Sequence, residues 1–163
     1  MEIGRLWRFN IAAAALVGIS AIVHIAAADT RAPSGPITIA EVTAGAGAGS
    51  SRLANVTDLL RHDVEAELSA INWAKLGIRR RYTISASLVR LESTTTGAKS
   101  LLASCTVSVA VRDSAQGTIL AIVEGRARAE DMPAAAAAAE RDALAGAARG
   151  AITAVPEAIK RSQ

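Results

Sequence analysis

The most reactive side-chain types are scarce in this 163-residue chain. Cys105 is the single cysteine, and His62 is the single histidine after residue 28. A nucleophilic thiolate needs a positively charged, partly exposed surrounding. Cys105 instead alternates with three valines, which predicts a small core residue. His62 follows Asp58 by four residues, so the two share a helix face. An Asp–His pair becomes catalytic only where further groups converge on it, and on a charged face this spacing is typical of solvated surface.

Paired carboxylates on the same predicted helix are a second candidate chemistry. Asp63 with Glu67, or Asp58 with Asp63, would act as acid and base only if their surroundings separated the two pKa values. Nothing in the sequence predicts burial of either group, so we expect a solvated face. A single cysteine excludes a disulfide framework and leaves too few ligands for a Cys/His zinc site. We predict no cofactor, no metal and no enzymatic activity; the alternative is a small secreted hydrolase that uses His62 or Cys105.

Residues 44–51, AGAGAGSS, form a glycine-rich segment between a predicted strand and a predicted helix. A dinucleotide-binding fingerprint needs G-x-G-x-x-G, because its third glycine allows close helix–strand packing, and Ser50 stands at that third place. The fingerprint also needs an acidic residue at the end of a second parallel strand. We expect a plain flexible loop; an anion site at the N-terminus of the helix is the alternative.

Basic residues supply the best candidates for partner binding. The run Arg79–Arg81, with Lys75 nearby, could hold a phosphate, an acidic polymer or an anionic membrane surface. Arg126 and Arg128 lie two apart and share a strand face. Trp73 lies beside the basic run, and tryptophan and arginine are enriched in binding hot spots. The structural alternatives are a loop that blunts a strand entry and, for the tryptophan, a cap on the core. The predicted partner-binding residues are Trp73, Lys75, Arg79, Arg80, Arg81, Arg126 and Arg128.

The expected partner is a protein or another component of the cell envelope. Aromatic residues make up only 2% of the chain, which argues against a nucleic-acid binder that stacks bases on aromatic platforms. Without residues 1–28 the formal net charge falls from +3 to 16 − 14 = +2, which is close to neutral, so the charge says little about partners by itself.

The first 28 residues have the organisation of a secretory signal peptide. Residues 1–8 carry two arginines against one glutamate, and residues 9–28 are uncharged. Small residues at Ala26 and Ala28, directly before Asp29, match the A-x-A cleavage pattern. We predict cleavage after Ala28 and a periplasmic or secreted protein. Because a run of about 20 residues can also span a bilayer, an uncleaved signal anchor that leaves a membrane-anchored periplasmic domain is the alternative.

The rest of the chain is predicted to be a linker, residues 29–36, and one α+β domain, residues 37–163. Residues 37–42 alternate as a strand with Ile37, Ile39 and Glu41 on one face. A helix follows, with Gly77 as its stop. Its apolar stripe, at three- and four-residue steps, comprises Leu53, Val56, Leu60, Val64, Leu68 and Ile71.

Three runs with a period of two predict three further strands, and their short connections favour antiparallel hairpins. The positions expected to share the inner face are Tyr82, Ile84, Ala86 and Leu88, then Cys105, Val107, Val109 and Val111, then Ile119, Ala121 and Val123. The opposite face is polar, so we expect it to be solvated or to bind a partner.

A second helix is expected to close the chain. Asp131 is the predicted N-cap, Pro133 lies in the first turn, and Pro156 should kink or end the helix. The apolar stripe comprises Leu144, Ala148, Ile152, Val155 and Ile159. The predicted order is β-α-β-β-β-α, a mostly antiparallel sheet with two helices packed on one face.

A resemblance to known exported domains rests on a sequence of four features. They are the strand Val107-x-Val109-x-Val111-Arg112-Asp113, a turn that closes at Gly117, the pair Ile119-Leu120 and an alanine-rich amphipathic helix. Over residues 37–159 the pattern resembles the exported α+β domains of the curli-secretion lipoprotein group. It is also similar to the N-terminal domain of the Tol-system propeller protein and to the penicillin-binding-protein activator lipoproteins. The resemblance implies a cell-envelope domain that binds partners or assembles, with no catalytic residues to carry over. The lipobox of the lipoproteins and the propeller of the Tol protein have no counterpart here.

Overall fold

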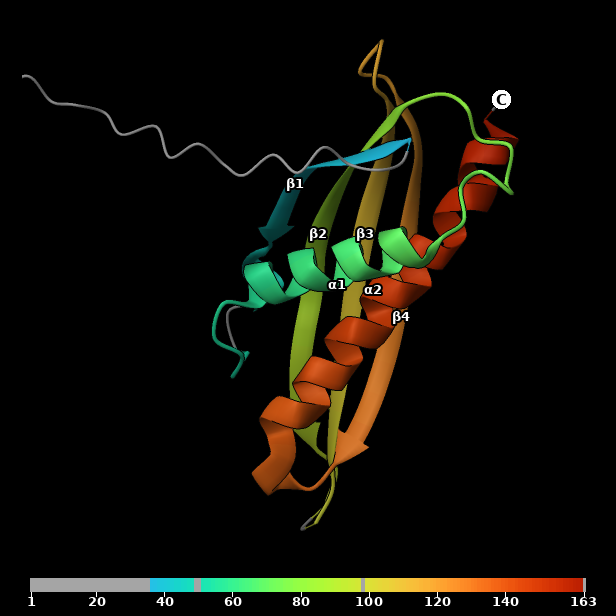
Figure 1. Ribbon diagram of the computed structural model, residues 1–163. Coiled ribbons are helices and arrows are strands. Elements are labelled where there is room, and N and C mark those ends of the chain that lie inside the picture. Colours follow the sequence, from blue (N-terminus) through green and yellow to red (C-terminus); the bar gives the residue numbers. More distant parts are fainter. Residues whose placement is uncertain (1–35, 49–50, 98, 163) are drawn as a thin grey trace, which may run out of the picture. The chain divides into compact units, whose positions relative to one another are not determined.

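The computed structural model of the chain describes residues 36–48, 51–97 and 99–162 (Figure 1). The predicted signal peptide, its cleavage residues Ala26, Ala28 and Asp29, and the linker up to residue 35 lie outside the described residues. The predicted boundaries of the signal peptide and of the domain therefore stay predictions.

Four strands form one sheet in the order β1-β2-β3-β4, in which β1 is parallel to β2 and the other pairs are antiparallel. Helices α1 and α2 cover the same face of this sheet (Figure 1). The predicted α+β class, element order and single helical layer are confirmed. The elements are β1 (Ile37–Ala44), α1 (Val56–Ala70), β2 (Tyr82–Thr95), β3 (Leu101–Asp113), β4 (Ile119–Asp131) and α2 (Ala136–Arg161).

The inner face of β2 and β3 follows the predicted alternation. All eight residues predicted to face inward on these two strands are buried, from Tyr82 to Leu88 and from Cys105 to Val111. Serine and threonine occupy most of the alternate positions, so one face of the sheet packs against helices and the other is polar.

Two irregularities in register change the inner face from the predicted one. In β1 the register shifts between Ile39 and Glu41, so that Val42 is buried and the glutamate is exposed. In the β3–β4 pair it shifts between Val111 and Arg112. Ile119 is consequently 46% exposed, and the neighbouring leucine packs against the core instead. A bulge inserts one residue and reverses the side-chain alternation beyond it.

Helix α1 is shorter than predicted. Its stripe is buried at Leu60, Val64 and Leu68, but the helix ends at Ala70 because Ile71 adopts an extended conformation. Gly77, the predicted stop, lies in the following loop with a φ of 70°.

Helix α2 buries all five residues of its predicted stripe. Asp131 is not its N-cap: this residue ends β4 and accepts a hydrogen bond from the Met132 N–H (2.7 Å). A 3-10 turn, Pro133–Ala135, precedes the helix. Pro156 does not end the helix, which continues to Arg161, so the two basic residues of the last turn complement the helix dipole as expected.

Candidate interaction surface

The reactive side chains lie apart in the fold. Cys105 is buried on the inner face of β3, and burial raises the pKa of its thiol to about 12. Because a thiol with that pKa is protonated at neutral pH, it supplies almost no thiolate nucleophile. The prediction of a core cysteine is confirmed. His62 and Asp58 are exposed on α1, and neither side chain bonds another described residue.

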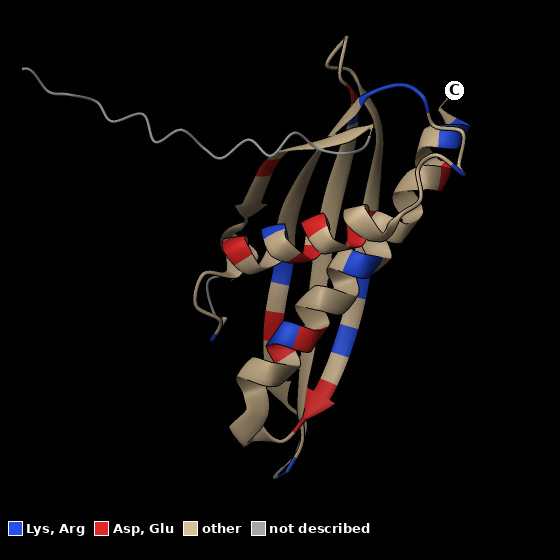
Figure 2. Ribbon diagram, viewed as in Figure 1, with Lys and Arg blue, Asp and Glu red and all other residues tan. Residues whose placement is uncertain are grey.

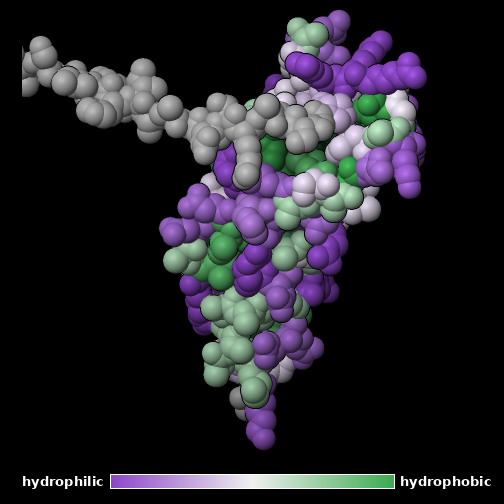
Figure 3. Space-filling view, viewed as in Figure 1, coloured by the Kyte–Doolittle hydropathy of each residue, from purple (hydrophilic) through white to green (hydrophobic). Residues whose placement is uncertain are grey.

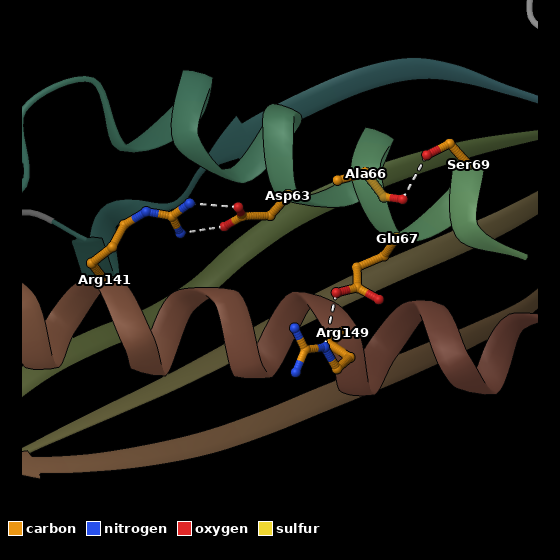
Figure 4. A network of polar contacts seen from close by, with 6 residues as sticks. All are labelled: Asp63, Ala66, Glu67, Ser69, Arg141 and Arg149. Carbon is orange, nitrogen blue, oxygen red and sulfur yellow. Dashed lines mark hydrogen bonds and ion pairs between the residues drawn. The ribbon is translucent and has the colours of Figure 1, made fainter.

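The prediction that the carboxylates of this helix lie on a solvated face is wrong for Asp63. Its side chain is buried and receives two hydrogen bonds from the Arg141 guanidinium, at 2.5 Å and 2.6 Å (Figure 4). One turn further along α1, Glu67 pairs with Arg149 at 2.8 Å. The hydrogen bonds that Arg141 donates to Asp63 raise the pKa of the Arg141 guanidinium. These carboxylates hold α1 against α2, and the sequence did not show this because the partners lie 78 and 82 residues away.

Glu140 is a buried carboxylate that the sequence analysis missed. It is fully inaccessible and accepts hydrogen bonds from the Ser51 hydroxyl (3.0 Å), the Arg52 N–H (2.8 Å) and the Ser93 hydroxyl (2.9 Å). It therefore joins α2 to β2 and to the segment before α1. A signal did exist, because Glu140 lies four residues before Leu144 and extends the apolar stripe of α2.

The glycine-rich segment is partly described, and that part is attached to the sheet. The Gly45 N–H donates to the Leu88 carbonyl (2.9 Å). A Cβ at Gly47 would lie 2.4 Å from the Val89 carbonyl oxygen, so this glycine is needed for close approach to β2. Residues 46–48 form a 3-10 turn. These residues are therefore not a plain loop, because their backbone packs on β2; the expected flexibility stays a prediction.

A basic corner lies in the loop between α1 and β2; we use this name for Trp73, Lys75 and Arg79–Arg81. The four cations are exposed, and none forms an ion pair with another described residue. The indole N–H of Trp73 donates to the Leu68 carbonyl (3.1 Å), and its ring packs against the core. Trp73 thus caps the core and still faces solvent in part.

An open hollow of about 570 Å³ adjoins the basic corner. Its apolar lining comes from Pro36, Ile71, Trp73 and Ile78. Figure 3 shows a small apolar area among strongly hydrophilic residues at this end of the domain. The combination of apolar lining and surrounding cations is typical of a surface that meets a partner.

Arg126 and Arg128 lie on the polar face of β4, away from the basic corner (Figure 2). The register places Arg90 in the same row as Arg126, with Thr106 between them. Because this row is eight residues along β2 from Tyr82, it lies about 26 Å from the basic corner. Arg126 pairs with Glu124 at 2.8 Å, and Arg90 pairs with Glu92 at 3.0 Å. The predicted binding residues therefore form two separate patches, which the structure does not bring together. One is the basic corner; the other, the Arg126 patch, consists of Arg126 and Arg128 with Arg90 in the same row.

Two further properties concern only the residues that the structure describes. Among them, no group of three or more His, Cys, Asp or Glu side chains is arranged to hold a metal ion. Within residues 36–48, 51–97 and 99–162, no helix has the length and apolar character needed to cross a membrane.

Comparisons with known proteins identify the fold. The sequence matches no family model, and it matches no curated protein. A protein of Xanthomonas campestris from family DUF330 is similar in structure, with a TM-score of 0.54 and 16% identity over 77% of this chain and 85% of that one.

Two further solved structures show weaker similarity. A protein of Caulobacter crescentus assigned as a lipoprotein has a TM-score of 0.46 and 17% identity over 78% of this chain and 90% of its own. A minor lipoprotein of Acinetobacter baumannii has a TM-score of 0.45 and 13% identity over 72% and 92%. These comparisons do not identify the curli-secretion, Tol or penicillin-binding-protein activator groups. The domain is similar in fold to the DUF330 protein.

Proposed function

We propose that this chain is an exported, non-enzymatic accessory protein of the cell envelope that acts by binding a partner or assembling with it. The predicted signal peptide, residues 1–28, supports export. The positions of Cys105, His62 and Asp63 count against the hydrolase alternative, because the first is buried and protonated, the second is exposed, and the third is neutralised by Arg141.

The basic corner is the proposed binding surface, and one observation carries this proposal. Its four cations lie within seven residues of the chain without an anionic partner among the described residues, beside the hollow that Trp73 helps to line. Neighbouring like charges repel each other, so such a cluster costs stability unless a partner of opposite charge compensates it. The Arg126 patch is the weaker candidate, because Glu124 and Glu92 already neutralise two of its arginines.

Crosslinking in cell envelopes, followed by mass spectrometry, tests this function. The triple variant Arg79→Glu/Arg80→Glu/Arg81→Glu should lose crosslinks while its melting temperature stays close to that of the unchanged protein, because all three side chains are exposed. The control is Arg52→Glu/Arg61→Glu/Lys99→Glu, which makes the same change in net charge at positions outside both patches. Unaltered crosslinking of the Arg79–Arg81 variant would remove the basic corner as the binding surface.

The predicted processing needs its own measurement. Cleavage after Ala28 would leave Asp29 as the first residue of the mature protein, followed by the linker and the domain. N-terminal sequencing of the protein from envelope fractions distinguishes this product from a retained signal anchor.

A further inference from the structure

The basic corner is part of a larger positively charged end of the domain. Arg81 accepts a hydrogen bond at its carbonyl from the Ser114 N–H (3.1 Å), which joins the corner to the β3–β4 turn. The start of β4 and Arg161 line one hollow of about 320 Å³, which places the end of α2 at the same end of the sheet. Figure 2 shows the cations of the corner and of the last turn of α2 at this end. We call residues 71–81, 112–118 and 157–162 the basic end.

The basic end concentrates the positive charge of the whole protein. Seven of the 18 lysines and arginines lie in it, but only two of the 15 aspartates and glutamates. Its formal charge is therefore +5, and the rest of the chain carries −2 of the total of +3. The cations are Lys75, Arg79, Arg80, Arg81, Arg112, Lys160 and Arg161, and the anions are Asp113 and Glu157.

The chain also enters the domain at the basic end. Because β1 is parallel to β2, Ile37 stands beside Tyr82, and the Tyr82 N–H donates to the Pro36 carbonyl (2.8 Å). The preceding linker, residues 29–36, spans at most about 28 Å when fully extended. Residues 9–28, if a membrane holds them as anchor or during export, are therefore joined to the domain through its basic end.

We propose that the basic end docks on the surface of an anionic phospholipid membrane. This proposal rests on the proposed function and names its partner. The seven cations provide long-range attraction to lipid phosphates. The hollow beside Trp73 provides an apolar surface of the kind that settles at the headgroup level. Both features lie where the chain leaves the domain toward the predicted membrane segment.

Co-sedimentation with vesicles tests the proposal. The protein is purified from the envelope, its N-terminus is sequenced, and it is mixed with vesicles of phosphatidylcholine alone or of phosphatidylcholine with phosphatidylglycerol. We expect binding only to the anionic vesicles, and release when salt rises from about 0.1 M to about 1 M. Each cation contributes about a fivefold factor to such binding. Loss of three cations alone gives a factor of about 100, and the three added carboxylates are repelled by the anionic surface, so the Arg79→Glu/Arg80→Glu/Arg81→Glu variant should bind at least about 100-fold more weakly.

The charge-matched Arg52→Glu/Arg61→Glu/Lys99→Glu variant separates a local surface from net charge. It should bind within a few-fold of the unchanged protein, because its substitutions lie outside the basic end. Equal weakening of both variants would overturn the proposal, as would equal binding of the unchanged protein to neutral and anionic vesicles.

A retained N-terminal segment requires a second measurement, because it would insert into either vesicle. The chain is then reconstituted in both vesicle types, and cleavage by trypsin after Arg79, Arg80 and Arg81 is followed. Slower cleavage in the anionic vesicles supports docking, and equal rates contradict it. If the corner fails to bind vesicles but still crosslinks to an envelope protein, the docking proposal is wrong and the proposed function stands. If it does neither, both are wrong.

Discussion

At the scale of single residues, Glu140 shows how a buried charge is accommodated. The carboxylate has no exposed surface, yet both of its oxygens accept hydrogen bonds. One oxygen accepts from the Ser51 hydroxyl and the Arg52 N–H, and the other accepts from the Ser93 hydroxyl. Among the described residues, no buried side-chain nitrogen or oxygen lacks a hydrogen-bond partner. A buried charge is tolerated only when donors surround it in this way.

Glu140→Ala should lower the free energy of unfolding by about 2–4 kcal/mol, because it removes the shared acceptor of three donors and leaves a cavity. Glu140→Gln is the matched control: its amide oxygen still accepts from Arg52, and its amide nitrogen can donate to Ser93. We expect a clearly smaller loss for it. Urea denaturation of both variants measures the difference, and an alanine variant as stable as the unchanged protein would contradict the role of Glu140.

Cys105 makes stability depend on pH. In the folded protein the pKa of its thiol is about 12, against an ordinary value of 9.0. The unfolded chain therefore loses this proton first, and stability falls as pH rises above about 9. From about pH 8 to about pH 10 the unchanged protein should lose about 1.4 kcal/mol more than Cys105→Val, which cannot ionise. Urea denaturation at both pH values gives this difference; parallel losses would show that the thiol is not held neutral.

At the scale of elements, the contact between β4 and α2 depends on one glycine. A Cβ at Gly125 would lie 1.9 Å from the Ala147 carbonyl oxygen and 2.4 Å from the Ala151 nitrogen. Both are backbone atoms of α2, so a side chain at this position would push the helix away from the sheet. Helix α2 is also held to α1 by the ion pairs that Asp63 and Glu67 of α1 form with Arg141 and Arg149 of α2 (Figure 4).

Gly125→Ala should destabilise the protein by about 3 kcal/mol or more, because rigid backbone must move. Gly150→Ala is the control on α2: the nearest atom to its Cβ would be 3.6 Å away. Alanine also favours the helix over glycine by about 0.8–1.0 kcal/mol, so this variant should be more stable. Thermal unfolding compares the two, and equal melting temperatures would show that β4 and α2 are not in the described contact.

At the scale of the whole domain, topology organises the charge. The parallel pairing of β1 with β2 brings the chain entry to the end of the sheet where the α1–β2 loop carries its arginines. The antiparallel hairpin that follows brings the β3–β4 turn to the same end. Elsewhere many of the described carboxylates form ion pairs or hydrogen bonds, whereas the four cations of the basic corner have no ion-pair partner among the described residues.

The sequence by itself determined the elements and most of the core. Period-two and period-3.6 patterns depend only on local geometry, which is why the strands β2 and β3 and the stripe of α2 are as predicted. The burial of Cys105 followed from the same period-two pattern.

Only the tertiary structure decided which distant groups meet. The bulges that bury Val42 and expose Ile119 arise from pairing between strands, and the partners of Asp63 and Glu140 come from remote parts of the chain. The tertiary structure also shows that the Arg126 patch lies apart from the basic corner, and that Pro36 and Trp73 line the same hollow. Local periodicity specifies the direction of a side chain relative to its own element, whereas register and packing, which set the distances between elements, depend on the whole fold.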